Sequence, residues 1–206
     1  MASIASAEGH EIYSEKPNDS DEVHISFPDP ALAANQIFIQ ELTKLINNVY
    51  IEGESEFWKG GQIERCQPDE VRDLVASGRQ LAVAWRHSSS RTDVADIAGC
   101  LKVHMVDEKT GTFGILISAP VYRGKGVGRN LVQFAEGWAK QRGAVMMQME
   151  LLFANGWHHP LKTRLGEWYE RAGYKLIRAI DMAEMYPDLA TLLGRPCDLR
   201  VYQKPL

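Results

Sequence analysis

A glycine-rich, basic stretch at residues 121–129, Val-Tyr-Arg-Gly-Lys-Gly-Val-Gly-Arg, has the composition of an anion-binding turn. It follows a strand-like apolar run at residues 113–118 and precedes apolar residues that recur at helical spacing from Leu131 to Ala139. Glycines let consecutive N–H groups turn toward one anion, and a helix start adds unpaired donors and the positive end of the helix dipole. A phosphate group is therefore the expected ligand of this junction.

Two nucleotide-binding patterns fit this stretch poorly. A P-loop needs Gly, four residues and then Gly-Lys-Ser/Thr, and no window of the chain has that ending. The dinucleotide pattern Gly-x-Gly-x-x-Gly begins at Gly124 and Gly126, but its third position is Arg129. Glu150 lies near the place where a ribose-binding acid is expected, so a nicotinamide-dependent oxidoreductase stays as the weaker alternative.

A third pattern, Arg/Gln-x-x-Gly-x-Gly/Ala, is matched by Arg123, Gly126 and Gly128. It resembles the acyl-CoA pyrophosphate loop of the GNAT superfamily of N-acetyltransferases. Residues 168–174, Trp-Tyr-Glu-Arg-Ala-Gly-Tyr, are similar to the Tyr-Glu-Lys-x-Gly-Phe segment that follows in that family. Two motifs in the family's order make the resemblance specific over residues 114–174.

The resemblance implies acetyl-CoA as co-substrate, held by main-chain groups of the strand before the loop and by the loop itself. Lys162 stands where many relatives have an asparagine, seven residues before Tyr169. The implied coenzyme-binding residues are Leu116, Ile117, Ser118, Arg123, Gly124, Lys125, Gly126, Val127, Gly128, Arg129 and Lys162.

The catalytic groups are only partly indicated. The resemblance places Tyr169 near the coenzyme sulfur, where a phenol with a pKa of about 10 is a neutral donor to a thiolate of pKa about 8.5. In some relatives a glutamate that acts as the general base stands at the position of Thr112. The threonine hydroxyl cannot act as a base in its place. Glu150, His158, His104 and an ordered water chain stay open as the general base.

These features favour an N-acetyltransferase that moves an acetyl group directly from acetyl-CoA to a primary amine. The acidic charge balance favours a small-molecule amine as the partner. The missing glutamate leaves a second hypothesis, a non-catalytic acyl-CoA-binding sensor or interaction module. Because homodimers are frequent in the family, the resemblance also implies a homodimer.

The composition argues against several other classes of protein. The 206 residues contain 23 Lys and Arg against 27 Asp and Glu, and no long basic stripe supports nucleic-acid binding. No apolar run of 18 residues predicts a membrane span. The three cysteines are scattered without Cys-x-x-Cys spacing, which argues against a disulfide framework and a zinc site. We therefore expect no metal, reduced thiols and a cytoplasmic protein.

Residues 1–21 lack large apolar side chains and are predicted to be a flexible tail, which leaves residues 22–206 as one domain. The resemblance implies an α+β fold with a mixed, mostly antiparallel seven-stranded sheet, helices on both faces and a central parallel pair that splays. Predicted strands lie at residues 23–27, 80–86, 97–105, 112–118, 144–152, 175–181 and 199–204. Predicted helices lie at residues 29–50 and 68–77, between the loop and Gly143, at 161–172, and between 181 and 193.

Overall fold

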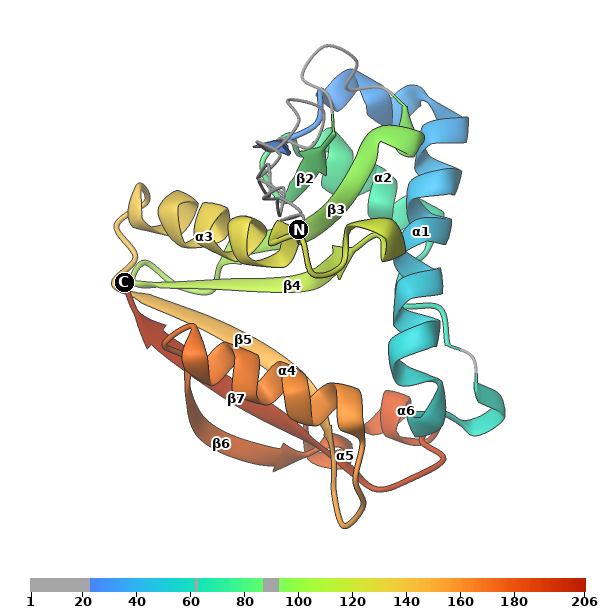
Figure 1. The fold of residues 1–206 in the computed structure, drawn as a ribbon, viewed down its shortest axis with the longest axis vertical. Helices are drawn as coiled ribbons and strands as arrows, with labels where there is room; N and C mark the ends of the chain where they lie inside the picture. The colour runs from blue at the N-terminus through green and yellow to red at the C-terminus, as the bar shows by residue number, and fades with distance from the viewer. Residues whose placement is uncertain (1–22, 62, 87–92) are drawn as a thin grey trace, which may run out of the picture.

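The computed structural model describes residues 23–61, 63–86 and 93–206. The predicted tail and the serine-rich connection at residues 88–90 lie outside these ranges. Seven strands form one sheet in the order β1-β2-β3-β4-β5-β7-β6 (Figure 1). All neighbours are antiparallel except β4 and β5, which confirms the predicted mixed sheet with a central parallel pair.

The strands have the order predicted from the sequence, with ends that differ by a few residues. They are β1 (His24–Ser26), β2 (Leu81–Trp85), β3 (Ile97–Met105), β4 (Thr110–Ser118), β5 (Met146–Ala154), β6 (Lys175–Asp181) and β7 (Cys197–Pro205). The helices are α1 (Gln36–Glu54), α2 (Pro68–Ala76), α3 (Val127–Lys140), α4 (Pro160–Arg171), α5 (Met182–Met185) and α6 (Pro187–Ala190).

The sheet separates two apolar layers. Every residue of β2 is buried, because Ala82 and Ala84 face the layer of α3 while Leu81, Val83 and Trp85 face the layer of α1 and α2. This two-sided burial explains why the strand has a continuous apolar sequence instead of an alternating one. In the part of the chain that the structure describes, no helix is long and apolar enough to span a membrane.

Helix α1 differs from the prediction at both ends. A 3₁₀ helix (Pro30–Ala34) precedes it, and the side chain of Asn35 accepts a hydrogen bond from the Phe38 N–H to cap the true start. At its other end the helix continues through Gly53 to Glu54, where the sequence predicted a loop. This extra turn places two acidic side chains, Glu52 and Glu54, toward the functional region described below.

The two central strands separate halfway along their length. Their pairing runs from Thr110 with Met146 to Phe113 with Met149 and ends there. Opposite β3, one extra residue of β4 forms a β-bulge, and Ile115 within it has a φ of +47°. Because a bulge bends its strand, β4 turns away from β5 directly after Phe113. The predicted splay is thereby confirmed, and we call the point of separation the fork.

Loops at one end of the sheet are bonded to each other. The Lys59 N–H donates to the Leu192 carbonyl at 2.9 Å, and the Gly194 N–H donates to the Phe57 carbonyl at 2.7 Å. Phe57 and Trp58 pack there with Leu152 of β5. The segment after α1 and the segment between α6 and β7 therefore form one continuous wall on this face of β5.

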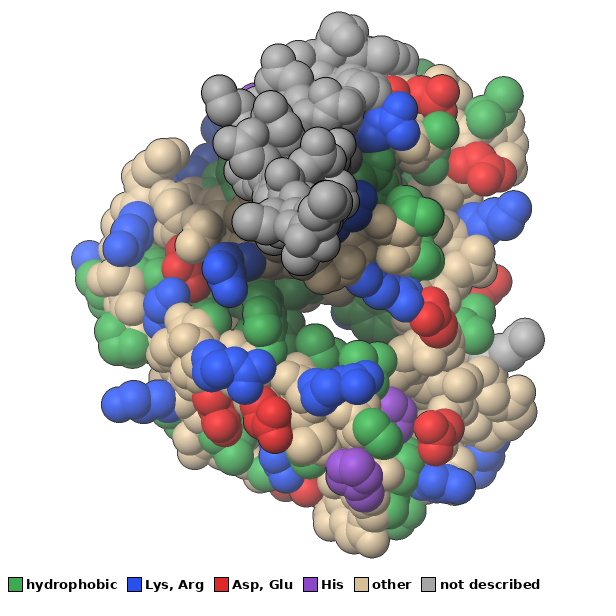
Figure 2. All heavy atoms as spheres, in the orientation of Figure 1, with side chains coloured by type: hydrophobic (Ala, Val, Ile, Leu, Met, Phe, Trp, Pro, Cys, Tyr) green, Lys and Arg blue, Asp and Glu red, His purple; other side chains and the backbone are tan. Residues whose placement is uncertain are grey.

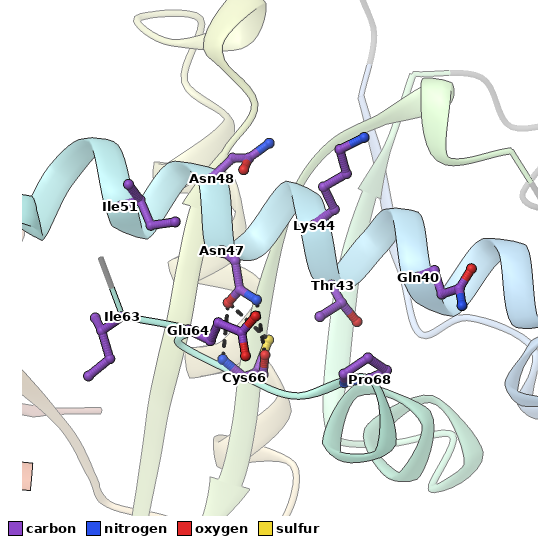
Figure 3. A pocket seen from close by; sticks show the side chains of 10 residues that line it. All are labelled: Gln40, Thr43, Lys44, Asn47, Asn48, Ile51, Ile63, Glu64, Cys66 and Pro68. Atoms are coloured by element: carbon purple, nitrogen blue, oxygen red, sulfur yellow. Dashed lines mark hydrogen bonds between the residues drawn. The ribbon is translucent and has the colours of Figure 1, made fainter. Parts of the chain in front are cut away.

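A groove on the outer side of α1 faces the segment of residues 63–68 (Figure 3). Inside it the buried Asn47 side chain donates to the Cys66 carbonyl at 3.0 Å and accepts from the Cys66 N–H at 3.1 Å. Both main-chain groups of Cys66 thus depend on one amide. These hydrogen bonds hold the segment of residues 63–68 against α1, so Asn47 has a structural role.

Replacing Asn47 with leucine is expected to lower the free energy of unfolding by about 2–4 kcal/mol, because two buried main-chain groups of Cys66 lose their partner. Chemical denaturation measures the change. Asn48→Ala is the matched control, since Asn48 is exposed and should change stability by less than about 0.5 kcal/mol. Equal stabilities of the two variants would contradict the role assigned to Asn47.

Candidate active site

The fork lies at an opening in the molecular surface. Figure 2 shows this opening between the part of the molecule that carries α3 and β4 and the part that carries α4, beside α1. Beyond Phe113, the edge of β4 that faces β5 has no pairing with it. Main-chain groups of Leu116, Ile117 and Ser118 belong to this unpaired half of the strand. An extended ligand could pair there as an added strand does.

The glycine-rich loop ends at the start of α3, as the sequence predicted. Gly124 and Gly126 have φ values of +79° and +86°, and a Cβ atom at either position would meet open space. Gly126 is the N-cap residue and supplies no side-chain hydrogen bond, so the first N–H groups of α3 receive none from the cap. This geometry suits an anion at the helix N-terminus, close to the unpaired half of β4.

Arg123, the first residue of the loop motif, is bonded to α1. Its guanidinium forms two hydrogen bonds with the Glu52 carboxylate, one of them 2.7 Å long. These hydrogen bonds hold the pKa of Glu52 below its ordinary value. The side chain of Arg123 therefore anchors the loop to α1, which leaves the main chain to face an anion.

Tyr169 lies on α4 at the fork. Its ring centroid is 6.1 Å from that of Phe113, the last residue of β4 that pairs with β5. Burial raises the pKa of the Tyr169 phenol well above its usual range, and the nearby Tyr50 hydroxyl raises it further. The phenol is therefore a permanently protonated donor at neutral pH.

Glu150 follows Met149, the last residue of β5 that pairs with β4, and is exposed. Met149 packs in the same layer as Tyr169, whereas Leu152 packs against the wall formed by Phe57 and Trp58. Since side chains alternate along a strand, Glu150 shares the face of Leu152. Tyr169 and Glu150 thus flank the fork from opposite faces of the sheet.

The two histidines before α4 have different environments. His158 is exposed, in the turn between β5 and α4. His159 is buried, stacks on Phe57 with 4.9 Å between ring centroids, and its Nδ1 accepts a hydrogen bond from the Lys162 N–H. Burial lowers the pKa of His159, which keeps Nδ1 free to accept. His159 is thus an N-cap, and the role of His158 as a base stays a prediction.

Lys162 is buried and its ammonium bonds to the buried carboxylate of Glu54, at the end of α1. The structure thereby joins α4 to α1 across the fork. The predicted contact of Lys162 with the coenzyme stays a prediction. Among the described residues, no group of three or more His, Cys, Asp or Glu side chains is placed to hold a metal ion.

A model of the acetyltransferase (GNAT) domain family matches residues 77–176. The matched residues include both strands of the fork, the glycine-rich loop and α4. This part of the chain is a GNAT acetyltransferase domain. Its single parallel strand pair also differs from the doubly wound parallel sheet on which dinucleotide binding depends.

Solved structures share the fold of the GNAT domain along nearly the whole chain. An acetyltransferase from Streptococcus agalactiae has 21% identity and a TM-score of 0.60, covering 89% of this chain and 98% of that one. A chain of the NatC complex bound to Gag peptide and CoA has 17% identity and a TM-score of 0.60, covering 90% and 99%. A proposed acetyltransferase from Salmonella typhimurium, solved with its cofactor acetyl-CoA, has 16% identity and a TM-score of 0.59, covering 90% and 95%. No curated protein sequence matches the chain.

Several polar residues near the fork of the GNAT domain were missed by the sequence reasoning. They are Tyr50, Glu52 and Glu54 of α1, Arg65 in the following segment, and Tyr186 before α6. The residue spacing along α1 could have identified Tyr50 and Glu54. The apolar stripe of α1 continues from Ile46 at four-residue spacing into Tyr50 and then Glu54, so polar groups occupy a sheet-facing row.

Replacing Gly126 with valine is expected to weaken binding of acetyl-CoA about 10- to 100-fold. A β-branched residue at φ +86° strains the loop, and its side chain occupies the open space beside the donors. Isothermal titration with acetyl-CoA measures the effect. Gly137→Ala inside α3 is the control, because its added Cβ meets open space in an ordinary helix. Normal binding by a folded Gly126→Val variant would show that the loop does not hold the coenzyme.

Proposed function

We propose that this protein transfers the acetyl group of acetyl-CoA directly to a primary amine of a small molecule. The observation that carries the proposal is the placement of a protonated phenol, Tyr169, and an exposed carboxylate, Glu150, on opposite faces of the fork. Direct transfer needs a base on the side of the amine and a donor on the side of the leaving sulfur. Tyr169 and Glu150 suit these two roles because they lie on opposite faces of the sheet.

The residues present fit acetyl-CoA. The uncapped start of α3 and the open loop suit its pyrophosphate, and the unpaired half of β4 suits its amide-containing arm. The residues assigned to it are those of the loop, Arg123–Arg129, with Leu116, Ile117 and Ser118. Bound acetyl-CoA would supply an activated acetyl thioester. The Salmonella typhimurium neighbour was solved with acetyl-CoA, which supports this choice.

The chain's own residues then account for the proton movements. Glu150 takes a proton from the substrate ammonium and frees the nitrogen lone pair. Attack by the amine forms the N–C bond and breaks the C–S bond, and the second amine proton ends on sulfur. Because its raised pKa keeps the proton on Tyr169, this phenol stabilises the leaving sulfur by donating a hydrogen bond. Holding both reactants at the fork in a reactive orientation increases the rate further.

Titration with acetyl-CoA, followed by thiol release in a library of primary amines, tests the proposal. Acetyl-CoA binding with turnover of a small amine is the expected result. Binding without turnover of any amine would favour the alternative of an acyl-CoA-binding sensor. Turnover confined to peptides would refute the small-molecule acceptor; NatC, one structural neighbour, was solved with a peptide.

A further inference from the structure

The phenol of Tyr169 is oriented by the aromatic rings around it. Its ring centroid lies 5.9 Å from that of Tyr174, 6.1 Å from that of Phe113 and 6.4 Å from that of Tyr202. Among the described residues, none forms a hydrogen bond with the Tyr169 hydroxyl. This hydroxyl is therefore available to a ligand, and the direction in which it points depends on how firmly the neighbouring rings are held.

Tyr174 is the neighbour that is held by its own hydroxyl. It is 1% exposed, and the hydroxyl donates a hydrogen bond to Glu136 Oε1 at 2.8 Å. Burial raises the pKa of Tyr174, and the Glu136 carboxylate raises it further, so the phenol stays protonated and keeps donating. The Tyr174 ring meets the rings of Tyr169 and Phe113 edge to face, the geometry that aromatic pairs favour.

The acceptor of this hydrogen bond is itself fixed. The Lys204 ammonium lies 2.9 Å from each carboxylate oxygen of Glu136, and the two side chains are only 27% and 13% exposed. Hydrogen bonds between charged groups are stronger than those between neutral ones. Lys204 Nζ also lies 5.5 Å from the ring centroid of Tyr174. Glu136 therefore offers the Tyr174 hydroxyl an acceptor at one defined position.

The bond between Tyr174 and Glu136, which we call the tether, connects the two sides of the fork. Glu136 belongs to α3, which packs on β3 and β4 and begins at the glycine-rich loop. Tyr174 follows α4 and precedes β6, on the side of β5 (Figure 1). Because β4 and β5 stop pairing at Phe113 and Met149, side-chain contacts must hold the two sides in place beyond that point. The tether is one of them.

We propose that Tyr174 is a positioning residue, whose tether to Glu136 fixes the Tyr169 phenol relative to the coenzyme bound at the start of α3. This inference rests on the proposed acetyl transfer, in which Tyr169 donates to the leaving sulfur. The GNAT segment that residues 168–174 resemble ends in phenylalanine, which has no hydroxyl to form such a bond. A misplacement of about 1 Å at a reacting group can cost about 100-fold in rate.

Tyr174→Phe tests the tether, because it removes the hydroxyl and keeps the ring. Glu136 still has Lys204 as its partner, so the variant should fold. We expect kcat to fall about 10-fold, while the Kd for acetyl-CoA changes less than about 3-fold, since the loop and β4 are untouched. Calorimetric titration with acetyl-CoA gives that Kd and also the fraction of binding-competent protein, by which kcat is corrected.

Tyr202→Phe is the matched control. Tyr202 is also 1% exposed and packs on Tyr169, but its hydroxyl has no hydrogen bond within the described part of the chain. This variant should keep its kcat. A normal kcat for Tyr174→Phe, or an equal loss in Tyr202→Phe, would overturn the proposal.

A double-mutant cycle shows whether Tyr174 acts through Tyr169. Tyr169→Phe alone should lower kcat about 10²- to 10³-fold, as the loss of one transition-state donor does. In that background the hydroxyl to be positioned is gone, so adding Tyr174→Phe should change kcat less than about 2-fold. A purely structural role would give the same loss in both backgrounds, and this result would refute the positioning role.

Fluorine NMR separates this proposal from the proposed reaction, because it needs no turnover. Meta-fluorotyrosine replaces Tyr169 in protein saturated with CoA. We expect one sharp resonance in the parent protein and in Tyr202→Phe, and a broadened or split resonance in Tyr174→Phe, where the phenol takes more than one orientation. This pattern without turnover of any amine would sustain the tether and refute acetyl transfer. An unchanged resonance in Tyr174→Phe would refute the tether even if acetyl transfer were found.

Discussion

Replacing Glu150 with glutamine is expected to lower kcat about 10²- to 10⁴-fold, the usual contribution of a general base. Glutamine keeps an oxygen that can accept the hydrogen bond from Tyr186, while it cannot take a proton. Because Glu150 is exposed, the change should leave the fold intact. Steady-state thiol release with a saturating amine measures the loss.

The pH dependence gives this prediction a second readout. Without a base, the rate of the variant depends on the fraction of amine that is already deprotonated. That fraction rises about tenfold per pH unit below the amine pKa. The deficit of Glu150→Gln should therefore shrink as the pH rises. Glu184→Gln, at an exposed carboxylate on α5, is the control and should have normal kcat. A normal kcat for Glu150→Gln would exclude Glu150 as the base and leave His158, His104 or water.

Replacing Lys162 with methionine is expected to lower the free energy of unfolding by about 3–5 kcal/mol. The change leaves the buried carboxylate of Glu54 without its partner, and an uncompensated buried charge is strongly destabilising. Methionine nearly preserves the length of the side chain, so the loss of charge dominates over the loss of packing. Thermal and chemical denaturation measure the change.

Two further variants test whether the unpaired charge of Glu54 causes the loss of stability. The double variant Lys162→Met with Glu54→Gln should recover part of the lost stability, because the unpaired charge is gone. Glu52→Gln breaks a second, exposed ion pair of α1, with Arg123. The two side chains are 58% and 42% exposed, so stability should change by less than about 1 kcal/mol. If Lys162→Met were as mild as Glu52→Gln, the buried pair would have no structural role.

The buried pair also bears on the departure of this chain from its family. At the position of Lys162 the resemblance implies an asparagine that contacts the coenzyme. In this chain the longer, charged side chain bonds to Glu54, which exists in that position only because α1 continues past Gly53. Together they bring α1 and α4 into contact beside the fork.

The resemblance to the GNAT superfamily implied the parallel pair at the centre of the sheet, and the sequence alone determined the glycine-rich loop and the order of the strands along the chain. These features depend on local patterns: glycine spacing, alternation along strands and helical periodicity. Tyr169 and Glu150 could be listed as candidates for the same reason. The motif gave Tyr169 its place in the chain, and elimination kept Glu150 among several bases.

Only the tertiary structure decided which of these residues share a site. Lys162 and Glu54 are 108 residues apart in the chain, and no local pattern relates them. The bulge at Ile115 sets where β4 leaves β5, and so puts the fork beside Glu150 instead of one residue earlier or later. Tyr186 comes within 3.3 Å of Glu150 through the segment between α5 and α6, whose conformation depends on packing. Contacts between distant segments follow from the whole core, which is why the sequence could not determine them.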